Sequence, residues 1–89
     1  MNRLEIIHLR LASAAPRGLA EDIRRAIAAD GKGSTARLYR HATLDGDLSI
    51  HLHFGSDEGS RHSDLVTHLA RALREYGMVE HTVWLEAGE

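Results

Sequence analysis

Histidines are the residues of this chain whose type and spacing could do chemistry. His51 and His53 alternate with apolar residues, so both imidazoles would lie on one face of a strand. Imidazole titrates near neutral pH and can act as a general base, so we take His8, His51 and His53 as candidate catalytic residues. The same side chains could instead form hydrogen bonds in a contact between two chains. The sequence leaves both interpretations open.

A second group of side chains could bind a small ligand beside these histidines. Guanidinium groups pair with carboxylates, and aromatic rings supply flat apolar contact area. The candidate ligand-binding residues are Arg10, Arg37, Tyr39, His41 and Trp84. With one histidine as the base, such residues would orient an anionic substrate.

The same histidines do not predict a metal site. His51 and His53, with His8 or His41 from a neighbouring strand, could offer nitrogen ligands to zinc, copper or nickel. However, no carboxylate is expected on that face, and the chain contains no cysteine. We therefore expect no metal and no other cofactor.

Length and charge limit the classes of partner. The 89 residues are enough for one core, so we expect a single domain over residues 1–89. The chain has 11 basic and 13 acidic residues, and its net charge of -2 gives no general attraction to nucleic acid or anionic lipid. The apolar runs are far shorter than the roughly 20 residues that span a bilayer, and the amino terminus lacks the pattern of a signal peptide. We expect a cytoplasmic protein without nucleic-acid or membrane partners.

Hydrophobic periodicity predicts six elements that would position these residues. In chain order they are a strand at Arg3–Leu11, a helix at Pro16–Ala29, strands at Thr35–Leu44 and Asp47–Phe54, a helix from Ser60 or Ser63 to Gly77, and a strand at Val79–Glu86. This βαββαβ order predicts an α+β, ferredoxin-like sandwich. Its four-stranded antiparallel sheet would have the order 4-1-3-2, with both helices on one face.

The hairpin at Asp45-Gly46 decides which residues lie on the uncovered face of that sheet. A two-residue turn would place Tyr39 with the aliphatic residues of the next strand. A three-residue loop through Asp47 would pair Leu44 with Leu48 and place Tyr39 among the strand histidines. We prefer the second register because it matches apolar with apolar and polar with polar residues.

On this register the uncovered face combines aromatic, aliphatic and imidazole side chains, a mixture typical of protein contacts. Its expected members are Leu4, Ile6, His8, Arg10, Arg37, Tyr39, His41, Ser49, His51, His53, Thr82 and Trp84. We therefore expect a homodimer joined through this face, with Trp84 as an anchor.

The other face of the sheet is expected to hold the core against the two helices. The residues predicted to be buried there are Ile7, Leu9, Ile23, Ile27, Leu48, Ile50, Leu52, Leu69, Leu73 and Val83.

The element order, the length and the half-polar open face resemble the dimeric α+β barrel superfamily, which includes the antibiotic-biosynthesis-monooxygenase-like proteins. Two protomers of that superfamily close their open faces on each other and keep a ligand pocket between sheet and helices. The resemblance implies a homodimeric domain that binds a small ligand. The alternative is a small cofactor-free enzyme, monooxygenase-like or isomerase-like, with a histidine base.

Two other families share the βαββαβ order. Regulatory ACT domains carry a Pro-Gly pair before the first helix, where this chain has Pro16 and Gly18 separated by Arg17. RNA-recognition motifs display aromatic residues on their central strands, where this chain has serine and histidines.

Overall fold

The computed structural model describes residues 2–30, 35–55 and 61–88, and it shows the predicted βαββαβ order. The elements are β1 (Arg3–Arg10), α1 (Leu19–Asp30), β2 (Thr35–Arg40), β3 (Asp47–Phe54), α2 (Arg61–Leu73) and β4 (Met78–Leu85). The four strands form one sheet in which every neighbouring pair is antiparallel. The strand order is β2-β3-β1-β4, which is 4-1-3-2 when it is counted from the β4 edge.

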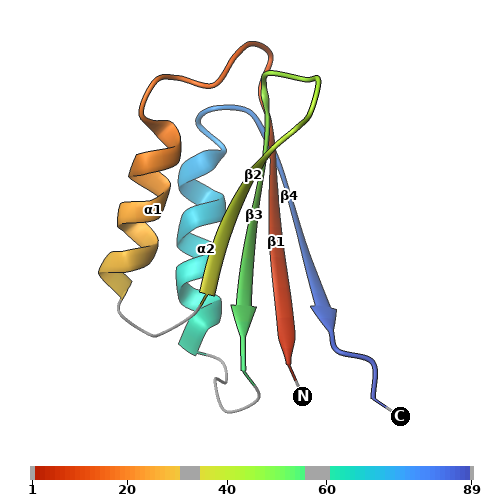
Figure 1. The fold of residues 1–89 in the computed structure, drawn as a ribbon. Helices are drawn as coiled ribbons and strands as arrows, with labels where there is room; N and C mark the ends of the chain where they lie inside the picture. The colour runs from red at the N-terminus through yellow and green to blue at the C-terminus, as the bar shows by residue number, and fades with distance from the viewer. Residues whose placement is uncertain (1, 31–34, 56–60, 89) are drawn as a thin grey trace.

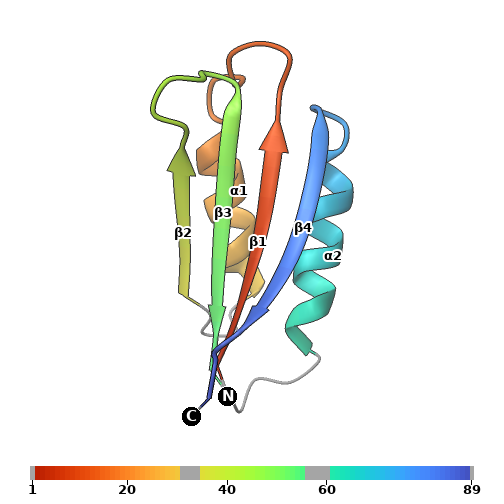
Figure 2. The same cartoon turned by 90° about the vertical axis from the view of Figure 1, so that its right-hand side faces the viewer.

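Both helices lie on the same side of the sheet, as the edge-on view of Figure 1 shows. Figure 2 shows the sheet in front and the helices behind it. One sheet face is therefore packed on the helices, and the other is covered by no element of the described chain.

Helix α1 begins later than the pattern predicts. Pro16 lies before the helix, and its carbonyl oxygen accepts the N–H of Leu19 at 3.2 Å. Gly18 takes a positive φ of 84°, a conformation that a residue without Cβ adopts at no cost. This turn redirects the chain, so the first helical residue is Leu19 rather than Pro16.

Helix α2 also differs from its predicted bounds. It begins at Arg61, so Ser63 is the third residue of the helix and does not precede it, while Ser60 is outside the described residues. It ends at Leu73, and the N–H of Tyr76 donates to the Leu73 carbonyl at 2.9 Å. This closing turn carries the chain toward β4.

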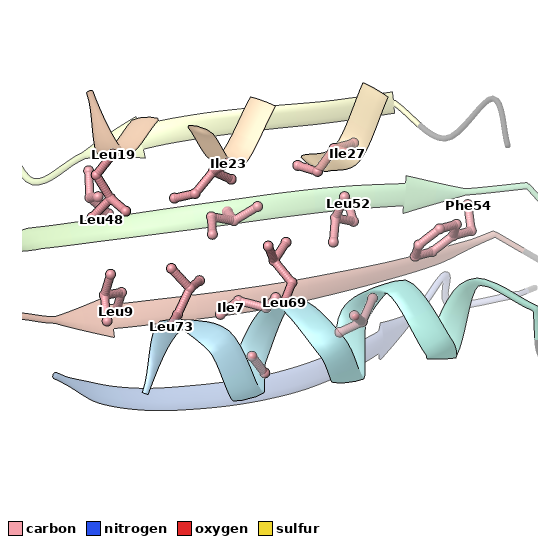
Figure 3. Close-up of a cluster of buried hydrophobic side chains, with 13 residues drawn as sticks. Ile7, Leu9, Leu19, Ile23, Ile27, Leu48, Leu52, Phe54, Leu69 and Leu73 are labelled. Carbon is pink, nitrogen blue, oxygen red and sulfur yellow. The ribbon is translucent and has the colours of Figure 1, made fainter. Parts of the chain in front are cut away.

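Aliphatic side chains from both helices meet the central strands β1 and β3 in the core (Figure 3). All the predicted core residues are buried except Val83, which is 53% exposed. The predicted burial of Val83 is therefore wrong. The predicted side is right, because Val83 pairs with the buried Glu5 on the helix side of the sheet. It lies on the edge strand, at an end where Leu85 on the same side is exposed too, so the helices do not cover it.

The hairpin has the predicted faces but a different register. Leu38 pairs with Ile50 and Tyr39 with Ser49, so the predicted pairing of Leu44 with Leu48 is wrong. Strand β2 ends at Arg40, and Leu44 lies exposed in the connecting loop. The shift is an even number of residues, and since side chains alternate with a period of two, every residue of β2 keeps its face.

His41 explains why β2 ends early. Its Nδ1 accepts the backbone N–H groups of Thr43 and Leu44, both at 3.1 Å. The Leu44 carbonyl then accepts the N–H of Asp47 at 3.2 Å. These bonds satisfy the backbone within the loop instead of extending the strand ladder.

Candidate functional site

The cross-strand pairs arrange the uncovered sheet face in rows, because directly paired residues point to the same side. From β2 to β4 the rows are Thr35, His53, Leu4 and Trp84; then Arg37, His51, Ile6 and Thr82; then Tyr39, Ser49, His8 and Glu80; and last Asp47, Arg10 and Met78. The first two rows contain the aliphatic residues, and we call them the apolar end. The last two rows are the polar end.

Asp47 is the centre of the polar end. Its carboxylate is nearly buried, with only 9% of the side chain exposed. Its Oδ2 lies 3.2 Å from His8 Nε2 and 3.7 Å from Arg10 Nε. A neutral His8 that donates its Nε2–H to this carboxylate has an unprotonated Nδ1. The carboxylate then orients the ring, and Nδ1 is the atom that can accept a proton as a general base.

A small hollow of about 110 Å³ opens beside this pair. Its wall includes His8, Tyr39, His41, Asp47 and Ser49. The hollow is therefore large enough to hold water or one small polar group.

His51 has a different environment from His8. Its Nε2 lies 2.9 Å from Ser49 Oγ, and its ring meets the Tyr39 ring edge-on at 4.7 Å between centroids. Burial lowers the pKa of His51 below 6.5, and the charge of nearby His53 lowers it further. A lower pKa favours the neutral imidazole at pH 7, and in the tautomer with an unprotonated Nε2 this ring accepts the Ser49 hydroxyl in a hydrogen bond.

These groups do not form a nucleophilic triad. The histidine that contacts Ser49 is His51, whereas the histidine that contacts Asp47 is His8. A serine–histidine–aspartate mechanism needs one imidazole between the hydroxyl and the carboxylate. The arrangement supports general-base chemistry at His8 better than nucleophilic catalysis at Ser49.

The structure brings some of the predicted site residues together and separates others. Tyr39 and His41 line the hollow with His8, and Arg10 approaches Asp47. Arg37 is exposed beside His51 on β2, and His53 is exposed at the apolar end.

Trp84 lies far from the hollow and is 58% exposed. It pairs with Leu4 in the first row, and its Nε1–H donates to Thr82 Oγ1 at 3.0 Å. Its position suits a contact with another surface better than a contact with a ligand in the hollow.

The role of Asp47 was not predicted, and no carboxylate was expected on the uncovered face. Asp47 is the first residue of β3, as in the predicted strand, and it is paired with Arg10 instead of lying in the three-residue loop of the preferred register. One signal was present: Asp47 precedes Ser49, His51 and His53 by even steps, which predicts the same sheet face.

A second polar cluster, on the helix side of the sheet, was not predicted. Glu5 is buried there, with its carboxylate oxygens 2.9 Å from Arg3 Nε and 2.8 Å from His81 Nε2. The Arg3 guanidinium also lies over the Phe54 ring, 4.7 Å from its centroid. This cluster ties β1 to the edge strand β4.

Within the described ranges, no group of three histidine, cysteine or acidic side chains could hold a metal ion. No helix in these ranges is both long and apolar enough to cross a bilayer.

Comparisons of the chain with models of protein families, with curated proteins and with solved structures find no match. Its function is therefore inferred from the geometry of the uncovered sheet face.

Proposed function

We propose that this chain is a homodimeric, ferredoxin-like domain whose two copies pack their uncovered sheet faces against each other. The supporting observation is that both helices lie on one side of the sheet (Figure 2), which leaves the apolar end of the other side without cover. Leu4 and Ile6 are only half-buried there, and Trp84 is exposed. Burying such side chains stabilises association by about 25 cal/mol per Å² before its entropic cost. The resemblance to the dimeric α+β barrel superfamily implies the same arrangement.

The size of the face suits a stable contact. Three strands of eight residues and one of six, at about 4.8 Å spacing and about 3.3 Å per residue, cover roughly 500 Å² in projection. The accessible surface of a corrugated face exceeds its projection, and specific interfaces bury about 800 Å² per partner. The sheet face therefore supplies much of the area that a dimer needs.

The charges of the face also suit contact between two copies. Arg10 and Arg37 are balanced by Asp47 and Glu80 when the imidazoles are neutral. A face without net charge does not repel its own copy at pH 8, and charges of both signs allow complementary pairing.

Sedimentation equilibrium at pH 8 tests this proposal. The wild type should be a dimer or a larger assembly, and Trp84→Ala should weaken association by about tenfold or more, since exposed tryptophans are frequent anchors of interfaces. Tyr76→Ala is the matched control, because Tyr76 is an exposed aromatic residue that follows α2 and is outside the sheet. A monomeric wild type, or equal effects of the two substitutions, would contradict the proposal.

The contact between His8 and Asp47 favours a second candidate function. In this alternative the domain is a cofactor-free enzyme, monooxygenase-like or isomerase-like, and His8 removes a proton from a carbon acid in the hollow. Of the three candidate histidines, His8 is the one that contacts a carboxylate within the described part of the chain, so it is the best-oriented base of the three. A partner sheet packed over the polar end would exclude water from the hollow.

Proton exchange provides a direct test of this alternative. The protein would be incubated in D2O with a panel of small enolisable ketones, and loss of their α-proton signals would be followed by NMR. Exchange above the buffer rate should disappear in His8→Gln and persist in the matched control His53→Gln. Equal rates in wild type and His8→Gln would remove His8 as a base for these substrates.

A further inference from the structure

Exposed apolar side chains gather on the edge strand β4. In the described part of the chain, seven large apolar residues are exposed, and four of them are on β4, namely Met78, Val83, Trp84 and Leu85. Met78 and Trp84 point to the uncovered face, whereas Val83 and Leu85 point to the helix side. A partner on the uncovered face alone would therefore leave half of this apolar surface in water.

The backbone of β4 also offers unused hydrogen-bonding groups. The N–H of Glu86 donates to the Asn2 carbonyl at 2.8 Å, which makes that pair a hydrogen-bonded position of the antiparallel ladder with β1. Because such positions alternate, the even-numbered residues of β4 bond to β1. The outward N–H and C=O groups are those of Val79, His81, Val83 and Leu85. Strand β4 ends the sheet, so no strand of the described chain pairs with them.

The two edges of the sheet differ in how they prevent pairing with another chain. Strand β2 carries the exposed side chains of Arg37 and Arg40, and charges of this kind are a common protection of edge strands. Strand β4 contains no lysine, arginine or proline, and its only carboxylate is that of Glu80. A long and largely apolar edge without these protections suits strand addition.

We propose that β4 pairs antiparallel with β4 of a second copy of this chain, around a two-fold axis at Thr82. The two sheets then continue as one sheet of eight strands, because each copy contributes four. This contact goes beyond the proposed face-to-face dimer, because it uses the outer backbone edge and helix-side residues. A chain that makes both contacts assembles beyond a dimer.

The register follows from the outward backbone groups. Two-fold symmetry around Thr82 pairs Val79 with Leu85 and His81 with Val83, so all four outward residues find partners. Thr82 then meets its own copy at a non-hydrogen-bonded position, where cross-strand threonines interact favourably. Glu80 faces Trp84, so no like charges are opposed.

Cysteine cross-linking tests both the contact and its register. The chain contains no cysteine, so Thr82→Cys introduces a single thiol. At a non-hydrogen-bonded pair the two Cα atoms are about 4.5 Å apart, within disulfide range. Mild oxidation should therefore give a covalent dimer. Glu80→Cys is the matched control, because its copies are displaced by four residues, about 13 Å, and should not cross-link. No cross-link in Thr82→Cys, or equal cross-linking in both variants, overturns the proposal.

Further variants separate this edge contact from the face-to-face contact, which could also approach Thr82. Val83→Pro removes an outward N–H without removing a bond to β1, and Leu85→Lys adds a charge at an exposed edge position. Each, combined with Thr82→Cys, should reduce cross-linking by about tenfold or more, while sedimentation still reports any face-to-face dimer. Circular dichroism checks that each variant is folded. If the proline variant does not fold, the result with Leu85→Lys tests the proposal. Unchanged cross-linking in a folded variant assigns the disulfide to another contact and overturns the proposal.

Discussion

Hydrogen-bond partners give the histidines of the sheet different roles. His8 contacts the carboxylate of Asp47, whereas His51 contacts the hydroxyl of Ser49. His41 binds backbone N–H groups of its own loop. Residues of one type on one face therefore divide into a candidate base, a neutral acceptor and a structural cap.

His51 should make the stability of the fold depend on pH. Burial and the charge of His53 lower its pKa, so below about 6.5 the unfolded chain binds more protons at this site than the folded chain. This contribution to stability is complete above pH 6.5 and is lost as the pH falls toward the pKa of the folded state. His51→Gln should therefore lose less stability than the wild type between pH 7 and pH 5, as measured by urea unfolding. His68→Gln, at an exposed position of α2, should follow the wild type; parallel curves for all three proteins would contradict this prediction.

His41 should stabilise the loop between β2 and β3. His41→Ala removes the acceptor of two backbone hydrogen bonds and should lower the free energy of unfolding by about 1 kcal/mol. His41→Asn should recover part of this loss, because an asparagine oxygen can accept the same N–H groups of the loop. Chemical denaturation measures both variants. An alanine variant as stable as the wild type would show that these bonds contribute nothing.

At the scale of elements, two connections pack closely on the end of β1. A Cβ on Gly46 would lie 2.7 Å from the Ser13 carbonyl oxygen, and a Cβ on Gly77 would meet the carbonyl oxygen of Arg10. The hairpin and the turn after α2 therefore reach the same end of the sheet because these two positions lack side chains.

Gly77→Ala should destabilise the fold by about 1–3 kcal/mol, since its methyl group would displace the backbone at the end of β1. Gly88→Ala is the matched control, because a Cβ there meets nothing within 4 Å. Thermal or chemical unfolding of the two variants measures the difference. Equal stabilities would mean that the turn after α2 shifts without cost.

At the scale of the whole molecule, acid should loosen the proposed face-to-face dimer before it unfolds the chain. His8, His51 and His53 lie on the same face as Arg10 and Arg37. Imidazoles in general take up protons near pH 6.5, so acid adds positive charge to a face that is balanced at pH 8. Like charges across an interface cost several kcal/mol, so association should weaken by about tenfold or more at pH 5.

Sedimentation equilibrium from pH 8 to pH 5 measures this change, with circular dichroism as the check on folding. Added salt should reduce the effect, because it screens the repulsion between the two faces. An affinity that is unchanged at pH 5 would place the strand histidines outside the interface.

Local patterns in the sequence determined where the helices and strands form and which of their side chains face the core. Alternation along β1 and β3 and the helical spacing of Ile23 and Ile27 predicted which residues form the core, because these periods depend only on nearby residues. The faces of the hairpin were also predictable, since they depend only on whether the register is odd or even.

Only the tertiary structure decided how distant residues meet. Asp47 and His8 are 39 residues apart, and their contact depends on the register between β1 and β3. Val83 has the pattern of a core residue, yet it is exposed because the helices do not extend over that end of the edge strand. Registers and helix coverage result from long-range packing and loop geometry, which periodicity along one segment does not encode.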